Sequence, residues 1–157
     1  MTASSSLRIE VRNVQRKLRV ALPELQLFAE AALRESLRRF PARRRKVERI
    51  DEILAVLVSD RRIAELHRRF MNIAGATDVI TFQHGEIFVS VETAAANAKR
   101  YRTTTDAELR LYVVHGVLHL LGFDDTNDRA AELMRKTQLT ILKAASAVTE
   151  KRRHGLK

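Results

Sequence analysis

The sequence predicts a single α+β domain in which a mixed sheet of about four strands packs with about five helices. Short segments with apolar residues at alternate positions indicate strands, and longer segments with apolar residues three and four apart indicate helices. Two adjacent strand patterns are separated by a glycine-containing loop, which indicates a hairpin. At 157 residues the chain suits one core, so we expect one domain over residues 1–157, with a basic tail from about residue 150.

The predicted strands are short and rich in branched or aromatic residues. Alternation of apolar residues indicates half-buried strands over residues 4–13 and 49–59. Residues 77–82, TDVITF, and 86–91, EIFVSV, flank the loop QHG. Because loops of this length and glycine content are typical of hairpins, we expect these two strands to pair antiparallel.

Two helices are predicted before the hairpin. Pro23 opens the first, and Pro41 marks its end. Either Ser59 or Asp60 can cap the second. Three apolar side chains of this second helix are expected on one inward face: Ile63, Leu66 and Phe70.

Three further helices are predicted after the hairpin, the first over residues 92–101. Thr105, with Glu108 three residues later, forms a capping box at the start of the next. Gly122 ends that helix by adopting positive φ. The last helix is amphipathic and fills most of the remainder, with these side chains inward: Leu133, Met134, Ile141 and Leu142.

Composition and charge limit the classes of function. There is no cysteine, so any metal must be held by nitrogen and oxygen. No apolar stretch reaches the roughly 18 residues of a membrane span, and the start MTASSSLRIEV lacks the apolar core of a signal peptide. We therefore expect a cytoplasmic protein with no membrane contact.

The formal net charge is +10, which favours a polyanionic partner and indicates nucleic acid. The densest basic runs are RRRK at 43–46 and KRR at 151–153. Each run alone is more typical of a solvated loop and a frayed tail.

The segment LRLYVVHGVLHLL, residues 109–121, is apolar on nearly every side and predicts a buried helix. Residues four apart share a helix face, so His115 and His119 can converge on one metal ion. In the alternative, each histidine only bonds a buried carbonyl or carboxylate. Two glycines favour the metal: Gly116 indicates close approach of another backbone, and Gly122 reverses the chain.

The reversal brings Asp124 and Asp125 back toward the two histidines. Two histidines and one aspartate, with an open coordination position, are typical of a catalytic rather than a closed structural site. Zinc is the first choice, while the carboxylate makes manganese, iron and nickel competitive. Hydrolysis is the chemistry that such a site suits. Zinc proteases have glutamate after the first histidine, and Gly116 in that position argues against a peptidase.

The block HGVLHLLGFDD, residues 115–125, resembles the HGxLHLxGyDH signature of the YbeY-type metal-dependent endoribonucleases, or rRNA maturation factors. Phe123 replaces a tyrosine and Asp125 the last histidine. ATDVITF and GEIFVSVETA resemble two further blocks of that family, TDVLSF and GDIxIS, in the same order. Together the matches cover residues 66–125.

The resemblance implies a four-stranded mixed sheet with helices and zinc in a basic cleft. It also implies hydrolysis of single-stranded RNA in rRNA maturation, including 16S rRNA 3′ end processing, and in ribosome quality control, with the ribosome or small-subunit proteins as partners. By position, the zinc ligands are His115, His119 and Asp125. Asp124 is expected to orient a ligating histidine without binding the metal itself. No general base is evident, so a water activated by the metal is the expected nucleophile, with support from Asp124.

The family usually carries a YR pair just before the TDVLSF strand, and Phe70 and Met71 stand there in this chain. Met71 cannot grip a phosphate as that arginine would. The candidate RNA-binding residues are therefore Arg68, Arg69, Arg43, Arg44, Arg45 and Lys46. Phe70 and Phe82 are able to stack on bases, but both are expected to face inward and to pack in the core. His84 is expected to be a solvated turn residue rather than a proton carrier.

Three hypotheses follow. The first is a metal-dependent endoribonuclease. The second is a ribosome-associated RNA-binding factor with a degenerate nuclease site. Its evidence is Met71 and Asp125, which replace the arginine and the last histidine of the family motifs. The third, a non-haem iron oxygenase with a facial triad, leaves the positive charge unexplained.

Overall fold

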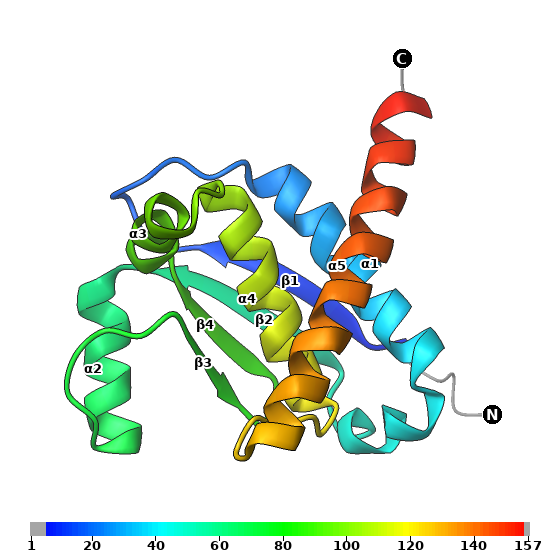
Figure 1. The fold of residues 1–157 in the computed structure, drawn as a ribbon, viewed down its shortest axis with the longest axis horizontal. Helices are drawn as coiled ribbons and strands as arrows, with labels where there is room; N and C mark the ends of the chain where they lie inside the picture. The colour runs from blue at the N-terminus through cyan, green and yellow to red at the C-terminus, as the bar shows by residue number, and fades with distance from the viewer. Residues whose placement is uncertain (1–5, 156–157) are drawn as a thin grey trace.

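In the computed structural model, residues 6–155 are described, and they form a four-stranded mixed sheet with helices packed on it (Figure 1). The strands are β1 (Arg8–Asn13), β2 (Glu52–Val58), β3 (Val79–Phe82) and β4 (Glu86–Ser90), in the order β1-β2-β4-β3. β2 pairs parallel with β1 and β4, and β3 pairs antiparallel with β4. The predicted α+β class and the predicted hairpin are therefore confirmed.

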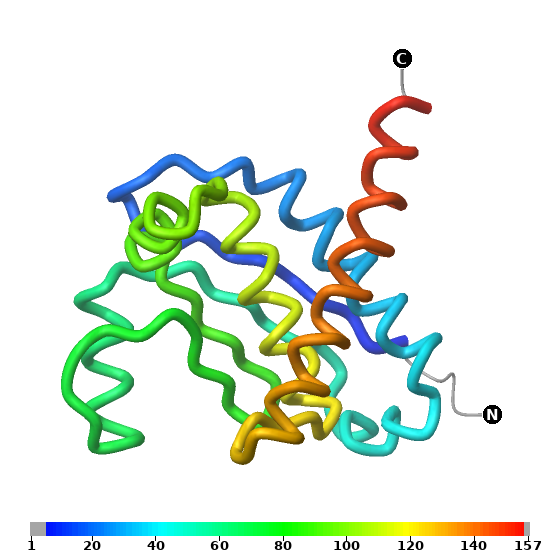
Figure 2. Tube along the Cα trace, viewed as in Figure 1, coloured from blue at the N-terminus to red at the C-terminus, as the bar shows by residue number. Residues whose placement is uncertain are grey.

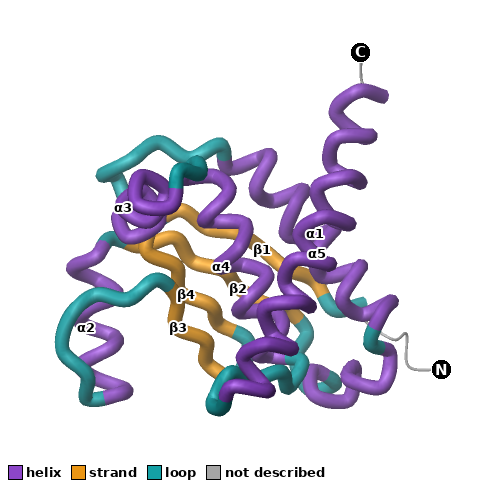
Figure 3. The backbone as a smooth tube through the Cα atoms, viewed as in Figure 1, coloured by secondary structure: helices purple, strands orange, loops and turns teal. Residues whose placement is uncertain are grey.

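Helices lie between β1 and β2, between β2 and β3, and after β4. Figure 3 distinguishes them from the strands by colour. Within the described residues they are five α-helices and one 3₁₀ helix: α1 (Leu22–Arg39), η1 (Pro41–Val47), α2 (Asp60–Met71), α3 (Val91–Tyr101), α4 (Thr105–Leu120) and α5 (Asp128–Gly155). Pro23 lies in the first turn of α1, as predicted. Ser59 caps α2, because its hydroxyl accepts a hydrogen bond from the amide of Arg62 at 3.2 Å.

Two apolar clusters lie on opposite faces of the sheet. The larger joins alternate residues of β1, β2 and β4 to α1, α4 and α5, and Figure 2 shows α5 passing α4 and continuing to the C-terminal end. The smaller packs Ile63 and Leu66 of α2 on Val56, Val58 and Ile80. Because strand side chains alternate between faces, α2 covers the face opposite to α4. The candidate metal ligands on α4 and the basic residues on α2 are thus separated by the sheet.

Several local predictions are wrong. Phe70 is 57% exposed rather than inward, because it lies in the last turn of α2, beyond the part of the helix that packs on the small cluster. Leu133 is exposed as well, while its neighbour Met134 takes the buried position in α5. The run at 43–46 is a 3₁₀ helix rather than a loop, and the run at 151–153 continues α5.

The predicted extent of the domain stays a prediction, and residues 1–5 and 156–157, which it includes, lie outside the described part. Among residues 6–155, no helix combines the length and the apolarity that crossing a membrane requires.

Candidate metal centre

α4 holds both predicted metal-binding histidines and is enclosed by neighbours. It packs against α1, α3, α5, β3 and β4, which explains why its sequence is apolar on nearly every side. Its cap is Thr104, whose hydroxyl accepts a hydrogen bond from the amide of Ala107 at 3.1 Å, so the predicted cap at Thr105 is wrong by one residue. Glu108 accepts a hydrogen bond from the Thr103 hydroxyl at 2.6 Å instead of closing a capping box.

His115, His119 and Asp125 lie together at the C-terminal end of α4. The Nε2 atoms of the two histidines are 2.9 Å apart. The Asp125 carboxylate oxygens lie 3.8 Å from Nε2 of His115 and 3.9 Å from Nε2 of His119. One donor atom from each residue lies within 4.8 Å of the others, so the three residues form a set able to hold a metal ion.

The loop after α4 brings Asp125 to the histidines. Gly122 adopts φ +87°, as predicted, and its amide donates to the carbonyl of His119 at 3.0 Å. The Phe123 amide donates to the carbonyl of Leu118, also at 3.0 Å. These two bonds turn the chain back over the last turn of the helix, which places Asp125 beside the histidine face.

The electrostatic environment favours neutral His119. Burial lowers the pKa of His119, and the neighbouring His115 lowers it further, while Asp125 opposes both effects. A histidine binds a metal through a deprotonated ring nitrogen, so the lowered pKa leaves His119 in its metal-binding form at neutral pH.

Arg43 of η1 contacts the loop that follows α4 and carries Asp125. Its Nη1 donates to the carbonyl of Leu121 at 3.2 Å, and its guanidinium lies 3.8 Å from the centre of the Phe123 ring. Lys46 lies beside Gly122 as well, with its Cε 3.2 Å from the point where a Cβ would stand. Two of the predicted RNA-binding residues therefore pack against the loop that carries Asp125.

Gly116 allows a close contact of a different kind from the one predicted. A Cβ at this position would lie 2.6 Å from Cγ2 of Ile87, so the neighbour that approaches is a side chain of β4 and not another backbone. The glycine lets α4 lie close to the sheet directly beside His115.

Gln138 of α5 was not anticipated, although it contacts the site directly. Its Oε1 accepts a hydrogen bond from Nδ1 of His115, which leaves Nε2 of that ring facing Asp125. A signal was present in the sequence, because Gln138 lies on the same helix face as the buried Met134 and Ile141.

An open hollow of about 230 Å³, the metal-side hollow, is lined by two of the three donor residues, His115 and Asp125. His115, Asp125, Gln138, Tyr112, Asp78 and Arg135 line it, together with apolar side chains. Arg135 is the one lysine or arginine in this lining. The Asp124 carboxylate accepts bonds from the amide and hydroxyl of Thr126 at 3.3 and 3.1 Å, and it is not bonded to either histidine within residues 6–155.

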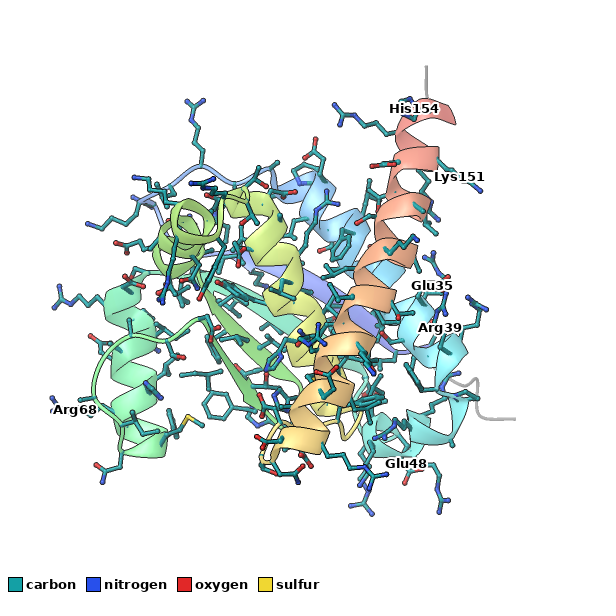
Figure 4. All side chains as sticks on the ribbon, in the orientation of Figure 1. Glu35, Arg39, Glu48, Arg68, Lys151 and His154 are labelled. Carbon is teal, nitrogen blue, oxygen red and sulfur yellow. The ribbon has the colours of Figure 1, made fainter. Side chains whose placement is uncertain are left out.

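The predicted RNA-binding residues do not form one surface. Figure 4 shows Arg68 on α2 at one edge of the molecule, whereas Glu48, directly after η1, lies at the opposite lower edge. Arg68 and Arg69 line a hollow with Asn72, on the face of the sheet away from α4. Arg44 and Arg45 line another hollow next to Pro41.

The fold and the donor set define a small α+β protein with an open, nitrogen- and oxygen-based candidate metal site. Residues 10–146 match the family model described as Endoribonuclease YbeY, so the chain belongs to the YbeY family.

Relatives and a solved structure agree with this assignment. Endoribonuclease YbeY of Bacteroides fragilis is 33% identical over 98 residues, covering 58% of this chain and 70% of that protein. The chloroplastic Endoribonuclease YBEY of Arabidopsis thaliana is 31% identical over 153 residues, covering 86% of this chain and 26% of that longer protein. The solution structure of a Thermotoga maritima protein superposes with a TM-score of 0.59 at 25% identity, covering 92% of this chain and 93% of that one.

Proposed function

We propose that the protein is a metal-dependent endoribonuclease that cuts single-stranded RNA. The family supports an RNA endonuclease role, because its model and its curated relatives carry the name endoribonuclease. We propose that this role lies in rRNA maturation. We extend the proposal to 16S rRNA 3′ end processing and ribosome quality control. The observation that carries the metal-dependent nuclease proposal is the convergence of His115, His119 and Asp125 beside an open hollow.

The donor set fits a divalent cation. Two imidazole nitrogens and one carboxylate oxygen suit zinc, which we propose as the bound ion, and the carboxylate also admits manganese, iron or nickel. Such a cation supplies Lewis-acid chemistry, since it acidifies water and polarises a phosphodiester oxygen. Gln138 fixes the ring of His115 so that Nε2 faces the other donors.

We assign the contact with the RNA backbone to Arg135. Met71, at the position where the family usually has arginine, is exposed at the end of α2 and offers no charge. Arg135 lines the hollow beside His115, and its guanidinium donates to the Glu132 carboxylate at 2.6 Å. Because this ion pair is exposed, it is weak, and a phosphate can compete for the guanidinium.

Partners and location remain proposals. We propose that the ribosome or small-subunit proteins present the RNA, and the predicted cytoplasmic location is retained. The net charge of +10 supports contact with an assembly rich in RNA.

The test combines elemental analysis of untagged protein with cleavage of a single-stranded RNA. Wild type is compared with His119→Ala and Asp125→Asn, and His154→Ala serves as control because it changes an exposed histidine far along α5. We expect about one metal ion per chain and cleavage for wild type and the control. His119→Ala and Asp125→Asn should lose both properties.

The other outcomes are distinct. Metal binding without cleavage by wild type would favour the RNA-binding factor with a degenerate site. Absence of metal from zinc-supplied wild type would refute the metal site and leave His115 and His119 as a structural pair.

A further inference from the structure

A group of aromatic side chains lies on the face of the sheet opposite to the metal centre. The rings of Phe70 and Phe88 each meet Phe82 edge to face, with centroids 5.2 and 5.8 Å from its own. The His84 ring stacks on Phe82 at 5.8 Å, with 22° between the planes. With Arg62 and Arg69 these four rings border a hollow of about 280 Å³, which we call the aromatic hollow.

The aromatic hollow is open on the side of Phe70. That side chain is 57% exposed within the described part of the chain. Met71 and Ile73, which follow it, are exposed as well. A phenylalanine in this setting offers a ring that a ligand can reach, supported from behind by Phe82.

The charge around the aromatic hollow favours an anionic partner. The Arg69 guanidinium lies 5.4 Å from the centre of the Phe70 ring. Arg62 borders the same hollow, and its ion pair with Glu65 at 3.2 Å is exposed and therefore weak. The one acidic residue in the lining, Glu86, is engaged by His84. Aromatic rings bordered by arginines suit nucleobases joined by phosphates, because bases stack on rings while the guanidinium groups meet the backbone.

We propose that the aromatic hollow stacks a base of single-stranded RNA bound to this protein. The inference rests on the proposed function and adds a second contact to it. β3 is an edge strand that links the two sites, because Val79 lines the metal-side hollow and Phe82 the aromatic hollow. Val79 and Phe82 are three positions apart, which is about 10 Å along the strand, so RNA that passes this edge can meet both hollows.

The chain offers a matched control for Phe70. Tyr101 of α3 is 59% exposed, and the Arg100 guanidinium lies 5.4 Å from its ring centre, as Arg69 does from Phe70. Within the described residues, Tyr101 has no aromatic neighbour and lines none of the hollows described above. The two positions therefore differ in the aromatic hollow rather than in exposure or adjacent charge.

The experiment measures binding of fluorescent oligo(A) by anisotropy in EDTA, beside a base-free oligomer of the same length. We expect Phe70→Leu to bind oligo(A) about tenfold more weakly than wild type, with equal binding of the base-free oligomer. Phe70→Trp should bind oligo(A) at least as tightly as wild type, and Tyr101→Leu should match wild type. Thermal unfolding checks that each variant is folded.

Unchanged oligo(A) affinity of Phe70→Leu would overturn the proposal, as would an equal loss in Tyr101→Leu. Equal affinity of wild type for oligo(A) and the base-free oligomer would also overturn it, and would favour a protein partner for this surface. Cleavage is scored separately with metal present. Base-dependent binding without cleavage would contradict the nuclease alone, whereas cleavage with unchanged Phe70→Leu binding would contradict the aromatic hollow alone.

Discussion

Gly116→Ala tests how closely α4 must lie to the sheet beside the metal centre. A Cβ at Gly116 would lie 2.6 Å from Cγ2, 2.8 Å from Cδ1 and 3.0 Å from Cγ1 of Ile87. Carbon atoms in favourable contact are about 3.5–4.0 Å apart, so the closest pair overlaps by about 1 Å. Ile87 is fully buried, and its Cγ2 branches directly from Cβ, so the side chain cannot swing aside without leaving its rotamer.

The expected magnitude is a balance of two effects. Overpacking a well-packed core costs about 1–3 kcal/mol, and three short contacts place this substitution toward the upper end. Replacing glycine by alanine inside a helix returns about 1 kcal/mol. We therefore expect Gly116→Ala to lower the free energy of unfolding by about 1–2 kcal/mol, although helix propensity alone predicts an increase.

The assay is urea unfolding of wild type, Gly116→Ala, Ile87→Ala and the double variant. Ile87→Ala alone should cost about 2–5 kcal/mol. In the Gly116→Ala background it removes all three crowded atoms, so we expect it to cost at least about 1 kcal/mol less there. Additivity of the two substitutions within about 0.5 kcal/mol, or a Gly116→Ala protein more stable than wild type, would refute the reasoning.

Two further predictions concern the lining of the metal-side hollow. Gln138→Leu removes the acceptor for Nδ1 of His115 and should weaken metal binding about 10–100-fold in a chelator competition, whereas Gln138→Glu should retain it; equal affinity of all three proteins would contradict a positioning role. Burial raises the pKa of Tyr112 to about 12, so in Tyr101→Phe, where Tyr112 is the one remaining tyrosine, the absorbance titration should have its midpoint near that value. The raised pKa also means that the contribution of Tyr112 to stability is complete below pH 10 and is lost as the pH rises toward 12; a midpoint near 10 would count against the burial.

The arrangement of the candidate site was predictable where it depends on local geometry. His115 and His119 share a face because helix periodicity requires it, and Gly122 reverses the chain through its positive φ. Asp125 follows within three residues of that glycine, so its approach needs no long-range information. The Asp125 contacts therefore follow from the same short stretch of sequence.

Features that depend on packing between distant elements were not predictable in the same way. Gln138 reaches His115 because α5 crosses α4 at one particular position, and helix periodicity shows the face of α5 but not that position. Phe70 of α2 is a second example. The apolar spacing of this helix indicates the face on which Phe70 lies, but it does not show where the opposing sheet surface ends. Arg43 resembles an RNA-binding residue in sequence, yet tertiary structure places it under the Asp125 loop.

The contacts of Arg43 join the metal centre to the first half of the chain. The loop that supplies Asp125 is anchored through Leu121 and Phe123 to η1, which lies between α1 and β2. A cation bound by Asp125 would fix that loop, so part of its binding free energy would raise the free energy of local opening of η1. Metal availability would then govern the integrity of a segment that supplies no ligand, and amide exchange across η1 should slow as zinc is added.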